Sequence, residues 1–417
     1  MIKKFRPILS SASFTNFVHL GLNQGVNVGV ALLITPMLYQ RLGAKHFGTV
    51  TFSLSIVMFL SIVVRYGFHL NGPKRIALAI NDTKETSGII NEILFTRGIL
   101  AFVTAGVMLL AMGVLNLFSD YALILSFSLI VLFGDALMPL FMLQGREKLS
   151  LLSKANAVSK LFYLALVFFF VHNIEDAKWV NFFFGGTTLL TNTILLGIIY
   201  RRWSLHFEKV KWSAFVARLK DNFEFFVSTI AGHVSVHGGF LILKAYVSGE
   251  ELGQYSLAQR VAFLLRMVPV FLTQSILQKA SRLFAQDQTQ FDAYLGKAYK
   301  MGLGITFVMG VAFMIASPWV ILIVGGEEVD YSSEVLRILC FIPFFGMLNV
   351  ANMIKILVAE RKDILSRATW ATAGIMLIMS IIGSKLYGGY GLAVALLISE
   401  VVSFGIHYYL LKHRTHI

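Results

Sequence analysis

Residues 89–115 read IINEILFTRGILAFVTAGVMLLAMGVL, and this stretch decides the fold class. From Gly98 to Leu115 it contains no charged residue. A helix needs about 20 mainly apolar residues to cross the hydrocarbon core of a bilayer. The stretch therefore predicts a transmembrane helix rather than a helix of a soluble protein.

The same pattern recurs along the whole chain of 417 residues. Hydrophobic residues make up 57% and charged residues only 14%, whereas soluble proteins carry roughly 25% charged residues. Twelve runs are long and apolar enough to span a membrane, so we predict an all-α polytopic membrane protein. The predicted spans are 14–38, 48–64, 89–115, 121–142, 155–171, 179–200, 223–245, 255–277, 303–324, 336–357, 368–386 and 392–411.

The distribution of basic residues predicts the orientation. The net charge is +14, and most of the 36 lysines and arginines fall in loops on one side of the predicted spans. Cytoplasmic loops are the ones enriched in lysine and arginine, so we predict both termini inside. This distribution also argues against nucleic acid as a partner. The opposite side holds only Arg41, Lys45, Lys178, Lys244 and Lys385.

The basic connection between the sixth and seventh spans predicts two halves. We expect an N-terminal six-helix lobe at 1–205, a basic cytoplasmic linker at 206–221 and a C-terminal six-helix lobe at 222–417. A short repeat supports a duplication, because Gly48 opens the second span and Gly253 opens the eighth after similar polar loops. Two pseudo-symmetric six-helix bundles around a central cavity are typical of transporters.

Five of the seven prolines lie inside predicted spans, where a proline removes a backbone hydrogen bond and kinks or interrupts a helix. These prolines are Pro36, Pro139, Pro269, Pro318 and Pro343.

Several kinds of chemistry are not indicated by the sequence. Cys340 is the only cysteine, which excludes a disulfide framework and a cysteine metal cluster. No Walker A pattern and no nucleophile–base arrangement is recognisable. We therefore expect a transporter and not an enzyme, with no catalytic residues, no cofactor and no metal site.

Basic residues inside the spans are the first candidates for a binding site. A charged side chain at the bilayer centre costs about 2.5–3.5 kcal/mol on insertion scales, so it tends to face water or a partner. We predict a cationic cavity lined by Arg266, Arg260, Arg97 and Lys160. Arg266 lies halfway along its span and is the best candidate for contact with a substrate anion, because guanidinium matches phosphate oxygens. The alternative is that these residues snorkel to the interface.

Uncharged polar residues form further stripes at helical spacing. We predict that they line the cavity, and the alternative for the histidines is hydrogen bonding between helices. The stripes comprise Asn16, His19, Asn23 and Asn27 in the first span, His233 and His237 in the seventh, and Gln259 in the eighth.

Two acidic residues also lie within predicted spans. Glu400 shares a helix face with Ser403 and His407, and Asp135 lies nearer the inner end of its span. Each of the two acids either neutralises a basic residue or binds a coupling cation, and the sequence leaves both interpretations open.

Several short segments, taken together, carry a resemblance to a known family. They are the stretch LGAKHFG at 42–48 followed by RYGF at 65–68 and GPKRIA at 72–77, the stretch GQYSLAQR at 253–260, and YGLAVA at 390–395 followed by Ser399 and Glu400. In order and spacing the chain is similar to bacterial polysaccharide-transport flippases, the Wzx-type O-antigen flippases. Their superfamily also contains the lipid II flippases and the MATE drug exporters.

This resemblance implies a function as well as a fold. It implies that an undecaprenyl-diphosphate-linked oligosaccharide is moved from the cytoplasmic to the outer leaflet of the bacterial inner membrane by alternating access. Its implied partners are that lipid-linked substrate, the bilayer, and the polymerase and chain-length machinery of the same pathway. One alternative is a cation-coupled multidrug exporter of the same superfamily, which should favour an acidic cavity. Another is a polymerase or ligase, which should have a large extracytoplasmic loop.

Overall fold

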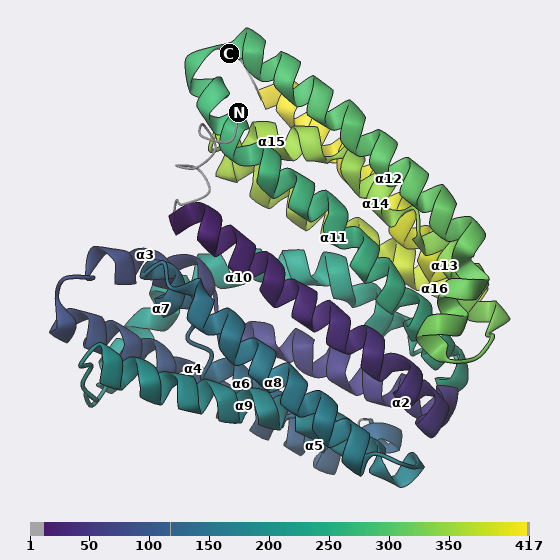
Figure 1. Cartoon of the computed structure of the whole chain (residues 1–417), viewed down its shortest axis with the longest axis horizontal. Helices are drawn as coiled ribbons and strands as arrows, with labels where there is room; N and C mark the ends of the chain where they lie inside the picture. Colours follow the sequence, from purple (N-terminus) through teal and green to yellow (C-terminus); the bar gives the residue numbers. More distant parts are fainter. Residues whose placement is uncertain (1–11, 117, 415–417) are drawn as a thin grey trace. The chain divides into compact units, whose positions relative to one another are not determined.

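The computed structural model describes residues 12–116 and 118–414, and all regular structure in this part of the chain is helical (Figure 1). Two short 3₁₀ turns, η1 (Ser119–Tyr121) and η2 (Ile174–Asp176), precede α5 and α9. The long helices are α2 (Ala12–Arg65), α4 (Thr83–Val114), α8 (Leu149–Phe170), α9 (Ala177–Arg202), α10 (Trp212–Leu243), α11 (Gly249–Gln286), α12 (Gln288–Gly325) and α16 (Lys362–Arg414). The shorter ones are α3 (Phe68–Leu78), α5 (Ala122–Ser128), α6 (Ile130–Ala136), α7 (Leu140–Gly145), α13 (Asp330–Leu339), α14 (Ile342–Leu348) and α15 (Val350–Val358).

The described helices confirm a multi-pass membrane protein. Nine stretches are long and apolar enough to cross a membrane, and the bent α10 makes ten. Two of the nine are 55 and 51 residues long, which at about 1.5 Å per residue is more than twice the hydrocarbon thickness. Each breaks at a glycine with positive φ, at Gly43 (69°) and at Gly388 (55°). The number twelve stays a prediction, because it depends on where the bilayer lies along these helices.

Prolines interrupt two of the predicted spans. The span predicted at 121–142 consists of α5, α6 and α7, with Pro139 immediately before α7. The span predicted at 336–357 consists of α13, α14 and α15, with Pro343 in the first turn of α14. Interruption is therefore confirmed at these two prolines. The other three prolines of the predicted spans, Pro36, Pro269 and Pro318, lie inside helices that do not end at them.

Contacts divide the chain into two compact units. The first unit comprises the chain up to Ile34 together with Ser53–Ile230, and the second comprises Thr35–Phe52 together with the chain from Ala231 onward. In the first, α9 packs against α5, α6 and α8, and α3 packs against α7. In the second, α11 and α12 pack against α13 and α14, and α16 packs against α14 and α15.

This division differs from the predicted lobes at 1–205 and 222–417 in two places. Thr35–Phe52 belongs with the second unit because its backbone approaches α11 closely: a Cβ built on Gly48 would lie 2.7 Å from the nitrogen of Gly253. The boundary near residue 230 falls inside α10, because the first half of α10 packs on the first unit. There the Phe226 ring stacks on Tyr66 with centroids 4.4 Å apart. Residues 212–221 of the predicted linker at 206–221 form the start of α10, which begins at Trp212.

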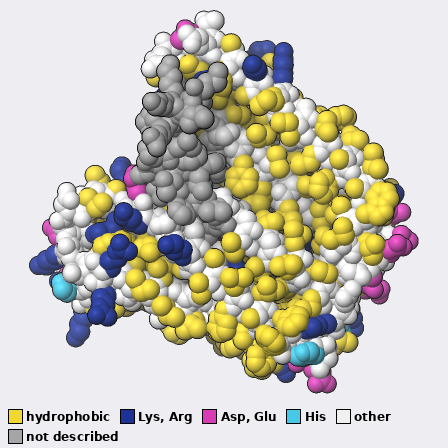
Figure 2. Space-filling model, in the orientation of Figure 1, with side chains coloured by type: hydrophobic (Ala, Val, Ile, Leu, Met, Phe, Trp, Pro, Cys, Tyr) yellow, Lys and Arg dark blue, Asp and Glu magenta, His cyan; other side chains and the backbone are white. Residues whose placement is uncertain are grey.

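Large apolar side chains remain exposed on the long helices, as lipid contact requires. On α4, Phe102 is 70% exposed, and on α12, Ile323 is 73% exposed. Hydrophobic side chains cover much of the visible surface in Figure 2, whereas lysine and arginine gather at the end of the first unit near α3 and α7. Exposed apolar surface of this extent would be unfavourable in water but is not unfavourable in contact with lipid chains.

Candidate functional site

A cavity of about 480 Å³ lies within the second unit and is the best candidate for a binding site. It is formed by α11, α14, α15 and both halves of α16. Apolar side chains, among them Val270, Leu277, Val350, Met353 and Leu396, make most of its wall. Its polar lining consists of Arg266, Thr273, Gln274, Asn349, Thr369, Thr372, Ser399, Glu400, Ser403 and His407. We call it the C-terminal cavity.

The charged group of the C-terminal cavity is an ion pair between α11 and α16. The Arg266 Nη2 donates to Glu400 Oε1 at 2.5 Å, and the two side chains are 29% and 18% exposed. Charges in a half-buried site of a membrane protein are stable when they are paired. Nε and Nη1 of Arg266 have no acceptor among the described residues. Arg266 therefore retains donors for a further anion.

Beside this pair lies a group of neutral polar side chains. Thr372 donates to Ser403 Oγ at 3.3 Å, and Nδ1 of His407 is 2.8 Å from the carbonyl oxygen of Ser403. Because a carbonyl oxygen only accepts, this contact places a hydrogen on Nδ1 and leaves Nε2 as an acceptor. His407 Nε2 and Asn349 Oδ1 are buried and have no hydrogen-bond partner among the residues that the structure describes. Buried polar atoms without partners are unfavourable, so the two residues offer acceptors that hydroxyl groups could satisfy.

The sequence spacing explains why these groups share one cavity. Glu400, Ser403 and His407 follow one another at intervals of three and four residues, so they lie on one face of α16, as predicted. Arg266 and Thr273, seven residues apart on α11, line the same cavity. Thr369 and Thr372 were not recognised from the sequence, although their spacing of three residues on a predicted span is the signal that could have found them.

Arg260 and Gln259 occupy a different part of the second unit. Arg260 donates to Thr35 Oγ1 at 2.6 Å, and its guanidinium lies 4.7 Å from the centre of the Phe47 ring. It thereby attaches the segment Thr35–Phe52 to α11. Gln259 is 7% exposed. Neither residue lines the C-terminal cavity.

The two histidines of α10 also lie outside the C-terminal cavity. Their rings stack on each other with centroids 5.8 Å apart, and His237 contacts the Phe263 ring edge-on at 5.7 Å. Ring contacts do not distinguish a cavity lining from hydrogen bonding between helices, so both interpretations of these histidines stay predictions.

The structure changes the interpretation of Arg97. Its side chain is 5% exposed, and it donates to the carbonyl oxygens of Met138, at 2.9 Å, and of Asp135. These two carbonyls lie where the helix breaks before Pro139 and lacks its own hydrogen bonds. Arg97 lines none of the described cavities. In this conformation Arg97 stabilises a helix break, and its place in a cationic cavity stays a prediction.

Asp135 and Lys160 are buried near Arg97 in the first unit. Asp135 accepts hydrogen bonds from Arg65 at 2.9 Å and 3.3 Å, which fits the neutralising alternative for this acid. Lys160 is 9% exposed, and its Nζ lies 3.6 Å from the centre of the Phe184 ring, a cation–π contact. The helix carrying Lys160 begins at Leu149, six residues before the predicted start of the span.

Of the four polar residues predicted to form a stripe in the first span, the structure describes only the side chain of Asn27. Asn156 on α8 donates to Asn27 Oδ1 at 3.0 Å, within the first unit. The side chains of Asn16, His19 and Asn23 lie outside the described part of the structure.

Known proteins share both the sequence pattern and the fold of this chain. The chain is 25% identical over 394 residues to a protein named "Putative O-antigen transporter" of Escherichia coli strain K12, covering 92% of this chain and 93% of the relative. It is 23% identical to one of the same name in Shigella dysenteriae, covering 93% and 97%.

Solved structures show the same fold. The structure titled "Lipid II flippase MurJ, inward closed conformation" matches with a TM-score of 0.74 and 15% identity, covering 96% of this chain and 87% of that one. An inward-facing multidrug resistance MATE family transporter of the MOP superfamily matches with a TM-score of 0.70 and 12% identity, covering 96% and 98%. The model of the family described as "Polysaccharide biosynthesis protein" matches residues 13–280. Since this match covers more than half of the chain, the protein belongs to the polysaccharide biosynthesis protein family.

Proposed function

We propose that this protein flips an undecaprenyl-diphosphate-linked oligosaccharide, an O-antigen or similar repeat unit, from the cytoplasmic to the outer leaflet of the bacterial inner membrane. The observation that carries the proposal is the C-terminal cavity, which combines one arginine, hydroxyl and amide groups, and an apolar wall. The names of the relatives and of the lipid II flippase support the same substrate class.

Each part of the substrate has a matching part of the cavity. The diphosphate is an anion, and the guanidinium of Arg266 offers it charge-assisted hydrogen bonds. The sugar hydroxyls meet Asn349, Thr372, Ser403 and His407. The polyprenyl chain stays among apolar side chains or in the bilayer, where its apolar surface is not exposed to water. Flipping needs no covalent step, so the proposal assigns no catalytic residue.

Glu400 is the proposed coupling group. Its carboxylate accepts a hydrogen bond from Arg266 Nη2, and a diphosphate would compete with this carboxylate for the same guanidinium. Protonation or cation binding at Glu400 would free Arg266 for substrate. Binding of the cation and binding of the substrate would therefore be linked. Asp135 is the weaker candidate because Arg65 already engages both of its oxygens.

The transport cycle is proposed to follow alternating access by two six-helix lobes, with both termini cytoplasmic. Arg260, Arg97 and Lys160 remain part of the proposal only for conformations in which their present contacts break. The polymerase and chain-length machinery of the same pathway are proposed as functional partners, since they use the flipped product.

The test is to delete the gene and determine on which leaflet the lipid-linked oligosaccharide accumulates. We expect short undecaprenyl-linked units to build up on the cytoplasmic leaflet and surface polysaccharide to be lost. A plasmid carrying the wild-type gene should restore the polymer. Normal surface polymer together with raised sensitivity to cationic drugs would overturn the proposal and favour a multidrug exporter.

A further inference from the structure

A second hollow lies in the first unit, at the basic end of α4 and α9, and plays no part in the proposed function. It has a volume of about 790 Å³ and is lined on its apolar side by Leu94, Phe95, Leu137 and Gly197. A smaller cavity of about 480 Å³ adjoins it and shares Asn91, Glu208, Lys209 and Val210 with it. We call the two together the linker groove, because residues 207–211 form one of its sides.

The linker is held firmly against the two helices. His206 N–H donates to Ser87 Oγ at 3.2 Å, and Asn91 on α4 donates to the carbonyl oxygen of His206 at 2.8 Å. Tyr200 on α9 donates to Asn91 Oδ1 at 2.9 Å, and the Phe207 ring stacks on Tyr200 at 4.4 Å. This side of the groove therefore has a defined structure.

The groove borders on surface that faces lipid. Phe95 on α4 is 39% exposed, and Ile194 and Ile198 on α9 are 55% and 49% exposed. Phe207 is 85% exposed although its ring stacks on Tyr200. Exposed apolar side chains of this kind at the end of a membrane protein's helices offer a surface for an acyl chain.

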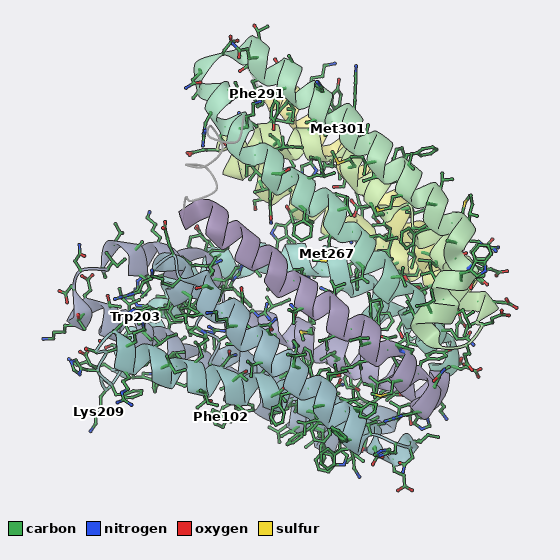
Figure 3. The ribbon with its side chains drawn as sticks, in the orientation of Figure 1. Phe102, Trp203, Lys209, Met267, Phe291 and Met301 are labelled. Carbon is green, nitrogen blue, oxygen red and sulfur yellow. The ribbon has the colours of Figure 1, made fainter. Side chains whose placement is uncertain are left out.

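The polar end of the groove is positively charged. Its charged lining consists of two lysines, Lys209 and Lys211, and two acids, Glu92 and Glu208. Lys209 lies at the edge of the first unit in Figure 3. Of the two acids, Glu92 is already paired with Arg75 at 3.1 Å and Arg218 at 3.2 Å. The surplus of positive charge therefore remains available to an anion.

We propose that the linker groove binds an anionic phospholipid of the leaflet that faces the basic loops. The phosphodiester would contact Lys209 and Lys211, and an acyl chain would lie between α4 and α9 against Phe95 and Gly197. The volume is within the range of pockets that hold small ligands of a few hundred daltons. Basic pockets between membrane helices on the cytoplasmic side recognise anionic headgroups by the same charge complementarity.

The test uses the purified protein in nanodiscs that contain phosphatidylglycerol and phosphatidylethanolamine. In one sample the phosphatidylglycerol carries a photoactivatable acyl chain, and in a second sample the phosphatidylethanolamine carries it. Cross-linked peptides are mapped by mass spectrometry. We expect phosphatidylglycerol to label the peptides of the groove, around residues 94–97 and 193–210. Equal labelling by the zwitterionic phosphatidylethanolamine would overturn the proposal.

Two matched pairs of variants test the two halves of the site. A Cβ added at Gly197 would meet nothing within 4 Å, so the backbone accepts a side chain there, and Gly197→Phe should fill the groove and abolish labelling. Gly106→Phe, on α4 and equally open, is the control that should leave labelling unchanged. If Gly197→Phe labels like the wild type, no acyl chain occupies the groove.

For the headgroup, removing one lysine should reduce the preference for phosphatidylglycerol about fivefold. Lys209→Gln tests this, and Arg201→Gln at the same end of α9 is the control. An unchanged preference in Lys209→Gln would overturn the headgroup contact. Because the readout is lipid labelling, the result is independent of whether the protein transports an oligosaccharide.

Discussion

The ion pair between Arg266 and Glu400 gives the sharpest prediction, because it separates stability from transport. Removing one partner of a buried pair leaves the other charge without compensation, which typically costs about 3–5 kcal/mol. Arg266 and Glu400 are 29% and 18% exposed and line a cavity, so water reduces the penalty. We expect Arg266→Met and Glu400→Gln each to lower the free energy of unfolding by about 2 kcal/mol.

The double variant Arg266→Met with Glu400→Gln should lose no more stability than either single variant, because no charge is left unpaired. This corresponds to a coupling energy of about 2 kcal/mol in the double-mutant cycle. Unfolding is followed in mixed micelles, and transport is followed by restoration of surface polysaccharide in a deletion strain. If Arg266 contacts the diphosphate, the double variant is stable but does not restore the polymer.

Two outcomes would contradict this reasoning. Additive losses of about 4 kcal/mol in the double variant would mean that the two side chains do not interact as the structure shows. Full restoration of surface polysaccharide by the double variant would mean that the pair only holds α11 against α16. Arg266→Lys adds a further check, because it keeps the charge but not the planar fork and should restore transport only in part.

Three further predictions concern the framework around the site. Gly253→Ala should lower the unfolding temperature strongly, because an added Cβ would overlap a neighbouring backbone carbonyl and such overpacking costs about 1–3 kcal/mol or more. The control Gly296→Ala, where the Cβ position is open, should leave the unfolding temperature unchanged. Equal unfolding temperatures for the two variants would contradict the close packing at Gly253. Arg97→Met should destabilise the protein by about 3 kcal/mol because two buried carbonyls lose their donor, and Arg97→Lys should not rescue it; wild-type stability in either variant would show that the helix break needs no cap. Asp287 caps α12, and the backbone N–H and side-chain amide of Gln290 hold the pKa of its carboxyl below the ordinary value of 3.8. Its contribution to stability is therefore full above that value and is lost as the pH falls through the lowered pKa, so Asp287→Asn should flatten the acid side of the stability profile measured by thermal unfolding.

The sequence alone determined the membrane character and the composition of several helix faces. Whether a run of about 20 residues can cross lipid depends on that run alone, because a helix forms all its backbone hydrogen bonds within itself in the bilayer. The grouping of Glu400, Ser403 and His407 follows from helix geometry in the same local way. Interruption at Pro139 and Pro343 was also predictable, because proline acts on its own turn.

Only the tertiary structure distinguished between arginines that look alike in the sequence. Arg97 and Arg266 both lie deep in predicted spans, yet Arg97 caps carbonyls 38 and 41 residues away, whereas Arg266 meets Glu400, 134 residues away, in a cavity. Likewise, the segment Thr35–Phe52 joins the second unit through contacts with residues more than 200 positions later. Local spacing fixes which face of a helix a side chain occupies, but the partner across that face depends on packing between distant parts of the chain.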